Sequence, residues 1–256
     1  MSKRRKFLLT SGILSSAFLF IQLSNFLFRY EAILVVIGVS LILSFWALRD
    51  SLRFNATVLT LVLPVLFTAG VGLFYFLLPA SQLARLPVVL LYGLGMYALL
   101  LTSNIYNVAS IRTIALLRAA HAVGFLLTLL ASFFLFDTLW SFRLYPHFNA
   151  LIAAFLALPL LLQNLWSIEL SDKISRRVWQ LAGVAGLIVG EISFMISLWP
   201  LTVLVSSLFL TSILYVILGL TQAYLQNRLF AKTVKEYLLV GLVVAIAVYV
   251  SARWGG

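Results

Sequence analysis

Cysteine is absent from this chain of 256 residues, and histidine occurs only at His121 and His147. The lack of cysteine excludes disulfide bonds, thiolate catalysis and metal sites built on cysteine. Two histidines are too few for a histidine-rich metal site. We therefore expect neither a metal ion nor a cofactor.

Charged residues are also scarce: they make up 10% of the chain, whereas 63% of it is hydrophobic. A soluble domain has about 25% charged and about 45–50% apolar residues. One protein core could not bury so much apolar surface, so the surroundings must be lipid. The apolar runs are about 17–25 residues long and do not alternate with polar residues, which favours helices over a β-barrel. The sequence predicts an all-α, polytopic transmembrane helical bundle.

Motifs for nucleotide, dinucleotide or zinc-peptidase chemistry are missing as well. No closely spaced acidic pair stands at a membrane boundary to hold Mg²⁺ for chemistry on lipid phosphates. The nearest pair, Glu169 and Asp172, is followed by three cationic residues, which is typical of a solvated turn with salt bridges. An enzyme is therefore disfavoured, although the sequence does not exclude one.

About nine apolar segments are separated by charged or proline-containing breaks. We expect them at residues 7–28, 31–48, 54–78, 87–109, 111–136, 148–166, 178–198, 201–222 and 237–252. The first follows four cationic residues and continues without a small-residue cleavage site. This pattern favours an uncleaved signal anchor over a cleaved signal peptide.

The lysines and arginines indicate an orientation, because cytoplasmic loops of membrane proteins are enriched in them. With a cytoplasmic N-terminus, 14 of the 18 fall inside. The inside residues are Lys3, Arg4, Arg5 and Lys6; Arg49 and Arg53; Arg112 and Arg118; Lys173, Arg176 and Arg177; Arg228, Lys232 and Lys235. The bias predicts a cell-membrane protein with its C-terminus outside. It also explains the net charge of +11 without nucleic acid, which we do not expect as a partner.

The outside turn expected at 137–147 contains Trp140, Phe142 and Tyr145. Aromatic residues of this kind are typical of the interface between bilayer and water. The alternative is a lid over an outward-facing site.

An internal repeat would divide this single membrane domain. Nearly the same number of residues separates Pro87 from Trp140 as separates Pro200 from Trp254. The spacing suggests an anchor helix at 1–30 followed by two parallel four-helix units, 31–140 and 141–256. Regular helices could also produce such a match by chance.

Three ionisable residues lie within the expected membrane segments, where charge is costly and often functional. Glu191 lies about 21 Å along its helix from Arg177. His121 is nearest to it in expected depth, and Arg118 shares a helix face with His121. A Glu191–His121 pair could relay protons or gate a cation. It could equally be a structural hydrogen bond between helices, and Arg118 could simply extend to the interface.

The segment at 87–109 ends in the most polar helical stretch of the chain, in which Asn104 and Asn107 share a face. These amides could line a cytoplasmic vestibule with Arg118, or they could bridge neighbouring helices. The stretch from Leu101 to His121, LTSNIYNVASIRTIALLRAAH, resembles a group of uncharacterised multi-pass membrane proteins from bacteria with small genomes. The resemblance implies a membrane location and no particular activity.

Two functional hypotheses remain. The first is a non-catalytic membrane scaffold or assembly component, whose buried polar groups fix helix packing. The second is a transporter or permease that moves a small molecule or ion along a polar path around Glu191, His121 and Arg118. The lipid bilayer is the one partner that composition demands.

Overall fold

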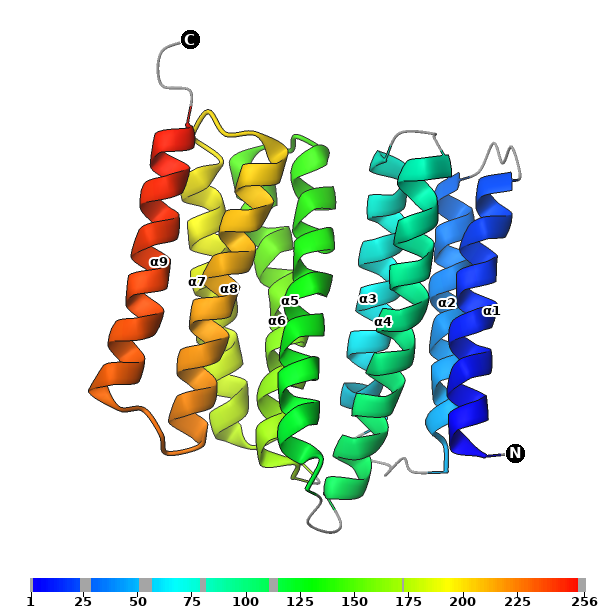
Figure 1. Cartoon of the computed structure of the whole chain (residues 1–256). Coiled ribbons are helices and arrows are strands. Elements are labelled where there is room, and N and C mark those ends of the chain that lie inside the picture. The colour runs from blue at the N-terminus through cyan, green and yellow to red at the C-terminus, as the bar shows by residue number, and fades with distance from the viewer. Residues whose placement is uncertain are drawn as a thin grey trace. The chain divides into compact units, whose positions relative to one another are not determined.

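The computed structural model describes residues 2–23, 29–50, 57–78, 82–110, 115–171 and 173–252. Within these ranges the chain forms nine α-helices and no strand (Figure 1), which confirms the predicted helical bundle. The helices are α1 (Lys3–Leu23), α2 (Arg29–Leu48), α3 (Thr57–Leu77), α4 (Gln82–Ala109), α5 (Leu117–Ser141), α6 (Pro146–Glu169), α7 (Arg176–Ile196), α8 (Val203–Leu225) and α9 (Ala231–Ser251).

The length of the helices follows from the lipid bilayer that surrounds them. In hydrocarbon, every backbone donor and acceptor must be paired within the segment, and about 20 apolar residues cross the bilayer. Eight helices, α2 to α9, are long and apolar enough to do so. In the part of α1 that the structure describes, cationic residues occupy the first four positions and shorten the apolar stretch. Residues 24–28, where this segment was expected to end, lie outside the described residues.

The chain separates into two compact units, Met1–Ala131 and Ser132–Gly256. In the first unit, α1 packs against α2 and α4, and α3 packs between α2 and α4. Aromatic rings fill the space between α1, α3 and α4: the ring centroids of Phe18 and Tyr92 are 4.7 Å apart, and those of Phe67 and Tyr92 are 5.6 Å apart. Tyr92 also shares a hydrogen bond of 2.9 Å with Thr68.

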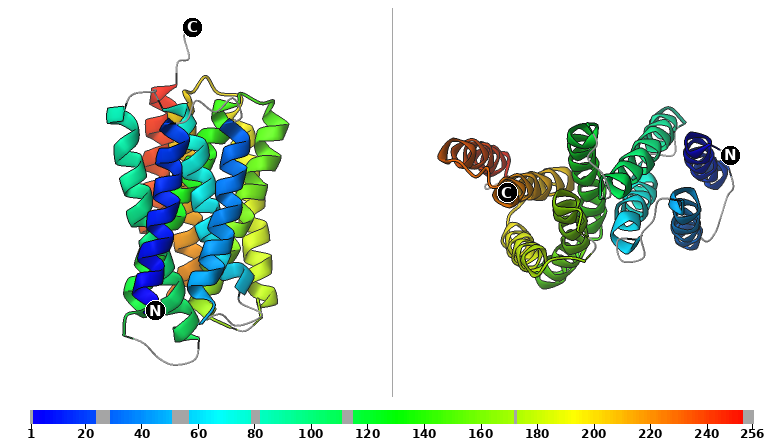
Figure 2. Two further views of the ribbon diagram at one scale, coloured as in Figure 1. Left: turned by 90° about the vertical axis from the view of Figure 1, so that its right-hand side faces the viewer. Right: turned by 90° about the horizontal axis from the view of Figure 1, so that it is seen from below.

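The second unit is built around the pair α6 and α7, and α8 packs against both. Helix α9 contacts α8 alone among the principal pairs, and Figure 2 shows it at the edge of this unit. Small residues let α6 and α7 approach closely. A Cβ atom added to Gly190 would lie 2.9 Å from the carbonyl oxygen of Ala150 and 3.0 Å from the Cβ of Ala154.

Some helix ends differ from the prediction. α4 begins at Gln82 instead of 87 and α9 at Ala231 instead of 237, because both helices start with polar and charged residues that precede the apolar run. The end of α5 differs as well. The segment expected within 111–136 is α5, which continues to Ser141, and α6 already begins at Pro146. The turn expected at 137–147 is therefore reduced to 142–145. The reason is that Asp137 does not end the helix: it is 7% exposed and its carboxylate accepts a hydrogen bond. The two units divide within α5, and the repeat expected over 31–140 and 141–256 stays a prediction.

Candidate functional site

The two amides singled out on α4 connect this helix to two others in the first unit. Asn107 is 2% exposed, and its Oδ1 accepts a hydrogen bond of 3.1 Å from the Thr60 hydroxyl on α3. Asn104 accepts a longer one, 3.4 Å, from Lys3 Nζ on α1. Both contacts join helices, as hydrogen-bonding side chains do in membrane bundles.

His121 and Arg118 lie in the first turns of α5. Arg118 is exposed, whereas His121 is half-buried beside Tyr106 of α4, with ring centroids 5.6 Å apart. The Tyr106 hydroxyl donates a hydrogen bond of 2.9 Å to the carbonyl oxygen of Ala120. This tyrosine therefore holds α4 against the part of α5 that carries the histidine.

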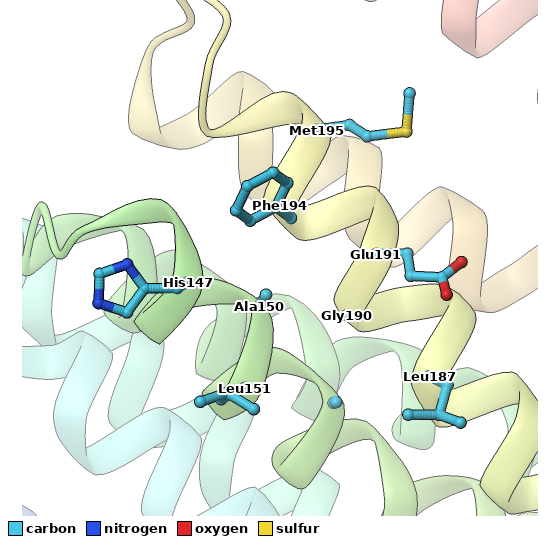
Figure 3. A pocket seen from close by; sticks show the side chains of 9 residues that line it. His147, Ala150, Leu151, Leu187, Gly190, Glu191, Phe194 and Met195 are labelled. Carbon is cyan, nitrogen blue, oxygen red and sulfur yellow. The ribbon is translucent and has the colours of Figure 1, made fainter.

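Glu191 lies on α7 in the second unit, on the side of a shallow groove of about 660 Å³ between α6 and α7. We call this surface the α6–α7 groove. It is lined chiefly by His147, Ala150, Leu151, Glu191, Phe194 and Met195. The Glu191 carboxylate is exposed among apolar side chains. Figure 3 shows the His147 ring and the Glu191 carboxylate on opposite sides of the groove, not facing each other.

The predicted pairing of Glu191 with His121 and Arg118 stays a prediction, because Glu191 belongs to the second unit and the other two residues to the first. Within its own unit, Glu191 is placed beside Gly190 at the closest approach of α6 and α7. One residue corresponds to about 100° of rotation around a helix. The carboxylate therefore lies beside the tight α6–α7 contact and not inside it.

A second hollow, of about 560 Å³, opens where the α5–α6 and α7–α8 turns meet. We call it the α5–α8 cavity. Its lining includes Trp140, Arg143, Asn149, Ser197, Trp199 and Thr202. Asn149 Nδ2 donates to Ser197 Oγ at 3.2 Å and to the Leu144 carbonyl oxygen at 3.3 Å. Asn149 Oδ1 and Trp140 Nε1 are buried and have no hydrogen-bond partner in the described part of the chain.

Sequence reasoning missed Asp137, which it placed in a turn. Its Oδ1 accepts a hydrogen bond of 3.0 Å from the hydroxyl of Ser207 on α8, so it is a buried carboxylate that joins two helices. One signal was available: no glycine or proline stands between Phe133 and Trp140, so nothing in the sequence ends the helix before the aspartate.

In the described ranges, no group of three or more His, Asp or Glu side chains is arranged to hold a metal ion. Comparison with known proteins gives one match. A family model described as "Protein of unknown function (DUF5656)" matches residues 10–251. The chain belongs to the DUF5656 family. No curated protein and no solved structure matches it. The DUF5656 match includes every residue that lines the α6–α7 groove and the α5–α8 cavity.

Proposed function

We propose that this DUF5656 protein is a non-catalytic membrane scaffold or assembly component, and that its α6–α7 groove receives a transmembrane helix of another protein. The observation that carries the proposal is the exposed side chain of Glu191 at the α7 edge of a groove whose other lining residues, apart from His147, are apolar. Lipid chains can fill such a groove, but they cannot pair with the acid.

A carboxylate in the membrane needs a partner. On insertion scales, Asp near the centre of a transmembrane helix costs about 2.5–3.5 kcal/mol. Glu191 is five residues before the end of α7 at Ile196, about 7.5 Å along the helix axis. Such a residue is retained more readily where another chain presents a hydrogen-bond donor to it. The partner helix should therefore present a lysine, arginine, amide or hydroxyl at the depth of Glu191.

The base of the α6–α7 groove is closely packed. Gly190 of α7 lies against Ala150 and Ala154 of α6, so the two helices have little room to shift relative to each other. The apolar walls formed by Leu151 and Phe194 then present a preformed surface. A preformed surface loses less conformational freedom when a helix docks on it.

A second copy of the chain is a poorer occupant. A symmetric dimer places the same patch of both copies across a two-fold axis. Pairing through this groove would bring one Glu191 towards the other, and like charges repel, most strongly in a medium of low dielectric constant. Charge complementarity therefore favours a different protein that supplies a donor.

The polar side chains inside each unit support the non-catalytic part of the proposal. Thr60 binds Asn107, Thr68 binds Tyr92, and the Asn164 amide oxygen accepts a hydrogen bond from Gln222. Each bond joins two helices of one unit. The transport alternative depends on a path from Glu191 to His121 and Arg118, which belong to a separate unit, and we do not propose it.

Site-specific photo-crosslinking in cells tests the docking proposal. A photoreactive phenylalanine analogue is placed at Met195, which is 60% exposed in the groove. Its matched control is Leu239 on α9, which is 61% exposed and outside the groove. We expect a protein adduct of defined mass at Met195, lipid adducts at Leu239, and loss of the protein adduct in Glu191→Leu.

Sequencing of the adduct decides the outcome. The crosslinked peptide should come from a transmembrane segment of another protein that contains a lysine, arginine, amide or hydroxyl residue. The proposal is overturned if Met195 and Leu239 give the same lipid adducts, if the captured chain is a second copy, or if Glu191→Leu leaves the adduct unchanged.

A further inference from the structure

Two unsatisfied polar atoms mark the α5–α8 cavity. Trp140 Nε1 can only donate a hydrogen bond and Asn149 Oδ1 can only accept one. Both are buried without a partner within the described residues, and Asn149 is 3% exposed. Native proteins seldom leave buried polar atoms unpaired. A hydroxyl group can accept from an N–H and donate to a carbonyl oxygen, so hydroxyl groups in the cavity would suit both atoms.

The same cavity has a positive charge at its edge. Arg143 is exposed in the turn between α5 and α6, and its guanidinium makes no hydrogen bond or ion pair with the side chains that the structure describes. Its backbone has a φ of 49°, in the left-handed region. Non-glycine residues adopt this conformation infrequently, and it carries strain. The turn thus holds an unpaired arginine at the cavity.

Four helix ends stand around the cavity: α6 and α8 begin there, at Pro146 and Val203, and α5 and α7 end there, at Ser141 and Ile196. The partial positive charges of the two starts are opposed by the partial negative charges of the two ends. The positive charge at the cavity is therefore that of Arg143. Asp137 on α5 is the nearest acidic residue along the chain. It does not line the cavity, and Ser207 already hydrogen-bonds its carboxylate.

We propose that the α5–α8 cavity binds the headgroup of an anionic phospholipid that carries a free hydroxyl, such as phosphatidylglycerol. The phosphate lies against Arg143, and the headgroup hydroxyls lie at Trp140 Nε1 and Asn149 Oδ1. The volume of about 560 Å³ falls within the range of ligand pockets. Trp140 and Trp199 suit the level of the headgroups, because tryptophan concentrates at membrane interfaces.

The shared chemistry is a phosphate ester with a neighbouring hydroxyl, which a soluble glycerol phosphate also offers. The lipid is the better source, because the cavity stands at the ends of four helices: α5 and α7 end, and α6 and α8 begin, beside its lining. Lipid headgroups surround the ends of membrane-spanning helices. The site is independent of the α6–α7 groove and would exist whether or not a partner helix docks there.

Native mass spectrometry of the purified full chain tests the assignment with four probes. They are phosphatidylglycerol, phosphatidylmethanol and phosphatidylcholine with identical acyl chains, and soluble sn-glycerol 3-phosphate. Phosphatidylmethanol has the same charge as phosphatidylglycerol without its hydroxyls. We expect phosphatidylglycerol to be retained about tenfold more strongly than either of the other lipids, as one or two satisfied polar contacts would give.

Two variants locate the binding. Arg143→Gln should reduce retention of both anionic lipids about tenfold, because it removes a charge-assisted contact. Trp140→Phe keeps the ring and removes the N–H, so it should reduce retention of phosphatidylglycerol and leave phosphatidylmethanol unchanged. The matched control is Arg228→Gln, which removes another exposed arginine charge after the end of α8, away from the cavity.

Three results would overturn the proposal. One is equal retention of the three lipids by the unaltered protein. Another is an equal effect of Arg143→Gln and Arg228→Gln, which would indicate general surface charge. The third is binding of glycerol phosphate that depends on Arg143 and Trp140 without retention of phosphatidylglycerol, which would replace the lipid by a soluble phosphate ester. Circular dichroism of each variant confirms that it remains folded.

Discussion

Ser206 and Ser207 are adjacent on α8, and both are fully buried. The Ser207 hydroxyl binds Asp137, whereas the Ser206 hydroxyl has no partner among the described residues. Ser207→Ala should lower the free energy of unfolding by about 1–3 kcal/mol, because it takes a hydrogen bond from a buried carboxylate. Ser206→Ala, the control, should change it by less than about 0.5 kcal/mol. Thermal unfolding in detergent measures both, and equal losses would contradict the assigned bond.

A second residue-scale prediction concerns pH. Asp50 follows α2, and Lys6 of α1 binds its carboxylate at 2.5 Å. That hydrogen bond is the main cause that lowers the pKa of Asp50 below its ordinary value of 3.8. The charges of Lys6, Arg49 and Lys3 lower it further, and burial opposes them. A lowered pKa in the folded state means that the contact stabilises the protein above about pH 4 and is lost as the pH falls through the folded value.

The melting temperature of the unaltered protein should therefore exceed that of Asp50→Asn at pH 7, and the difference should vanish as the pH falls below about 4. In a Lys6→Gln background, Asp50→Asn should show little of this pH dependence. A difference that grows in acid would have the opposite sign and would exclude the contact.

At the scale of single residues, position along a helix is easier to predict than the direction of a side chain. Counting from Arg177 gives the distance of Glu191 along α7, because helical rise is constant, and its depth in the membrane stays a prediction. Which way the carboxylate points depends on the rotation of α7, and the contact of Gly190 with Ala150 sets that rotation. The unpaired atoms of Trp140 and Asn149 could not be foreseen, since they arise where two turns distant in sequence meet.

At the scale of elements, the α6–α7 pair offers a matched test. Gly190→Ala would place a Cβ within 3.0 Å of Ala150 and Ala154, so the helices must separate. The Cβ of Gly186→Ala would lie at an ordinary 3.6 Å from the nearest atom, the carbonyl oxygen of Ala154. We expect Gly190→Ala to destabilise the protein by about 1–3 kcal/mol. Gly186→Ala should be neutral or stabilising by less than about 1 kcal/mol.

Denaturation in a graded detergent series would measure this difference. Equal stability of the two variants would mean that α6 and α7 are not in close contact at Gly190. Separation of the helices should also weaken the photo-crosslink from Met195, because the base of the α6–α7 groove would move. Gly186→Ala should leave that crosslink intact.

Helix positions followed closely from apolar length, because the thickness of the bilayer sets it. The predicted segment 31–48 became Arg29–Leu48, and the predicted segment 178–198 became Arg176–Ile196. The predicted end of α5 was wrong because the charged residue Asp137 was interpreted as the start of a turn. A carboxylate can remain inside a helix bundle when a neighbouring helix supplies a donor, as Ser207 does for Asp137.

On the scale of the whole molecule, membership of the DUF5656 family agrees with a membrane bundle and leaves the number of crossings and their orientation as proposals. In the first unit, Lys6 contacts Asp50, next to Arg49, so the start of α1 and the end of α2 lie at one end. These cationic residues were predicted to share the cytoplasmic side. The structure places them at one end of the unit, and the cytoplasmic orientation of that end stays a prediction.

Labelling of single cysteines from outside intact cells tests the topology most directly, because the natural chain contains no cysteine. Exposed positions are available in the turns and at the helix ends: Ser2, Phe142, Gln226 and Ser251. With nine crossings and a cytoplasmic N-terminus, a membrane-impermeant maleimide should label Phe142→Cys and Ser251→Cys in intact cells. It should label Ser2→Cys and Gln226→Cys only after permeabilisation. Labelling of Ser2→Cys and Ser251→Cys from the same side would contradict nine crossings and would mean that α1 does not span the membrane.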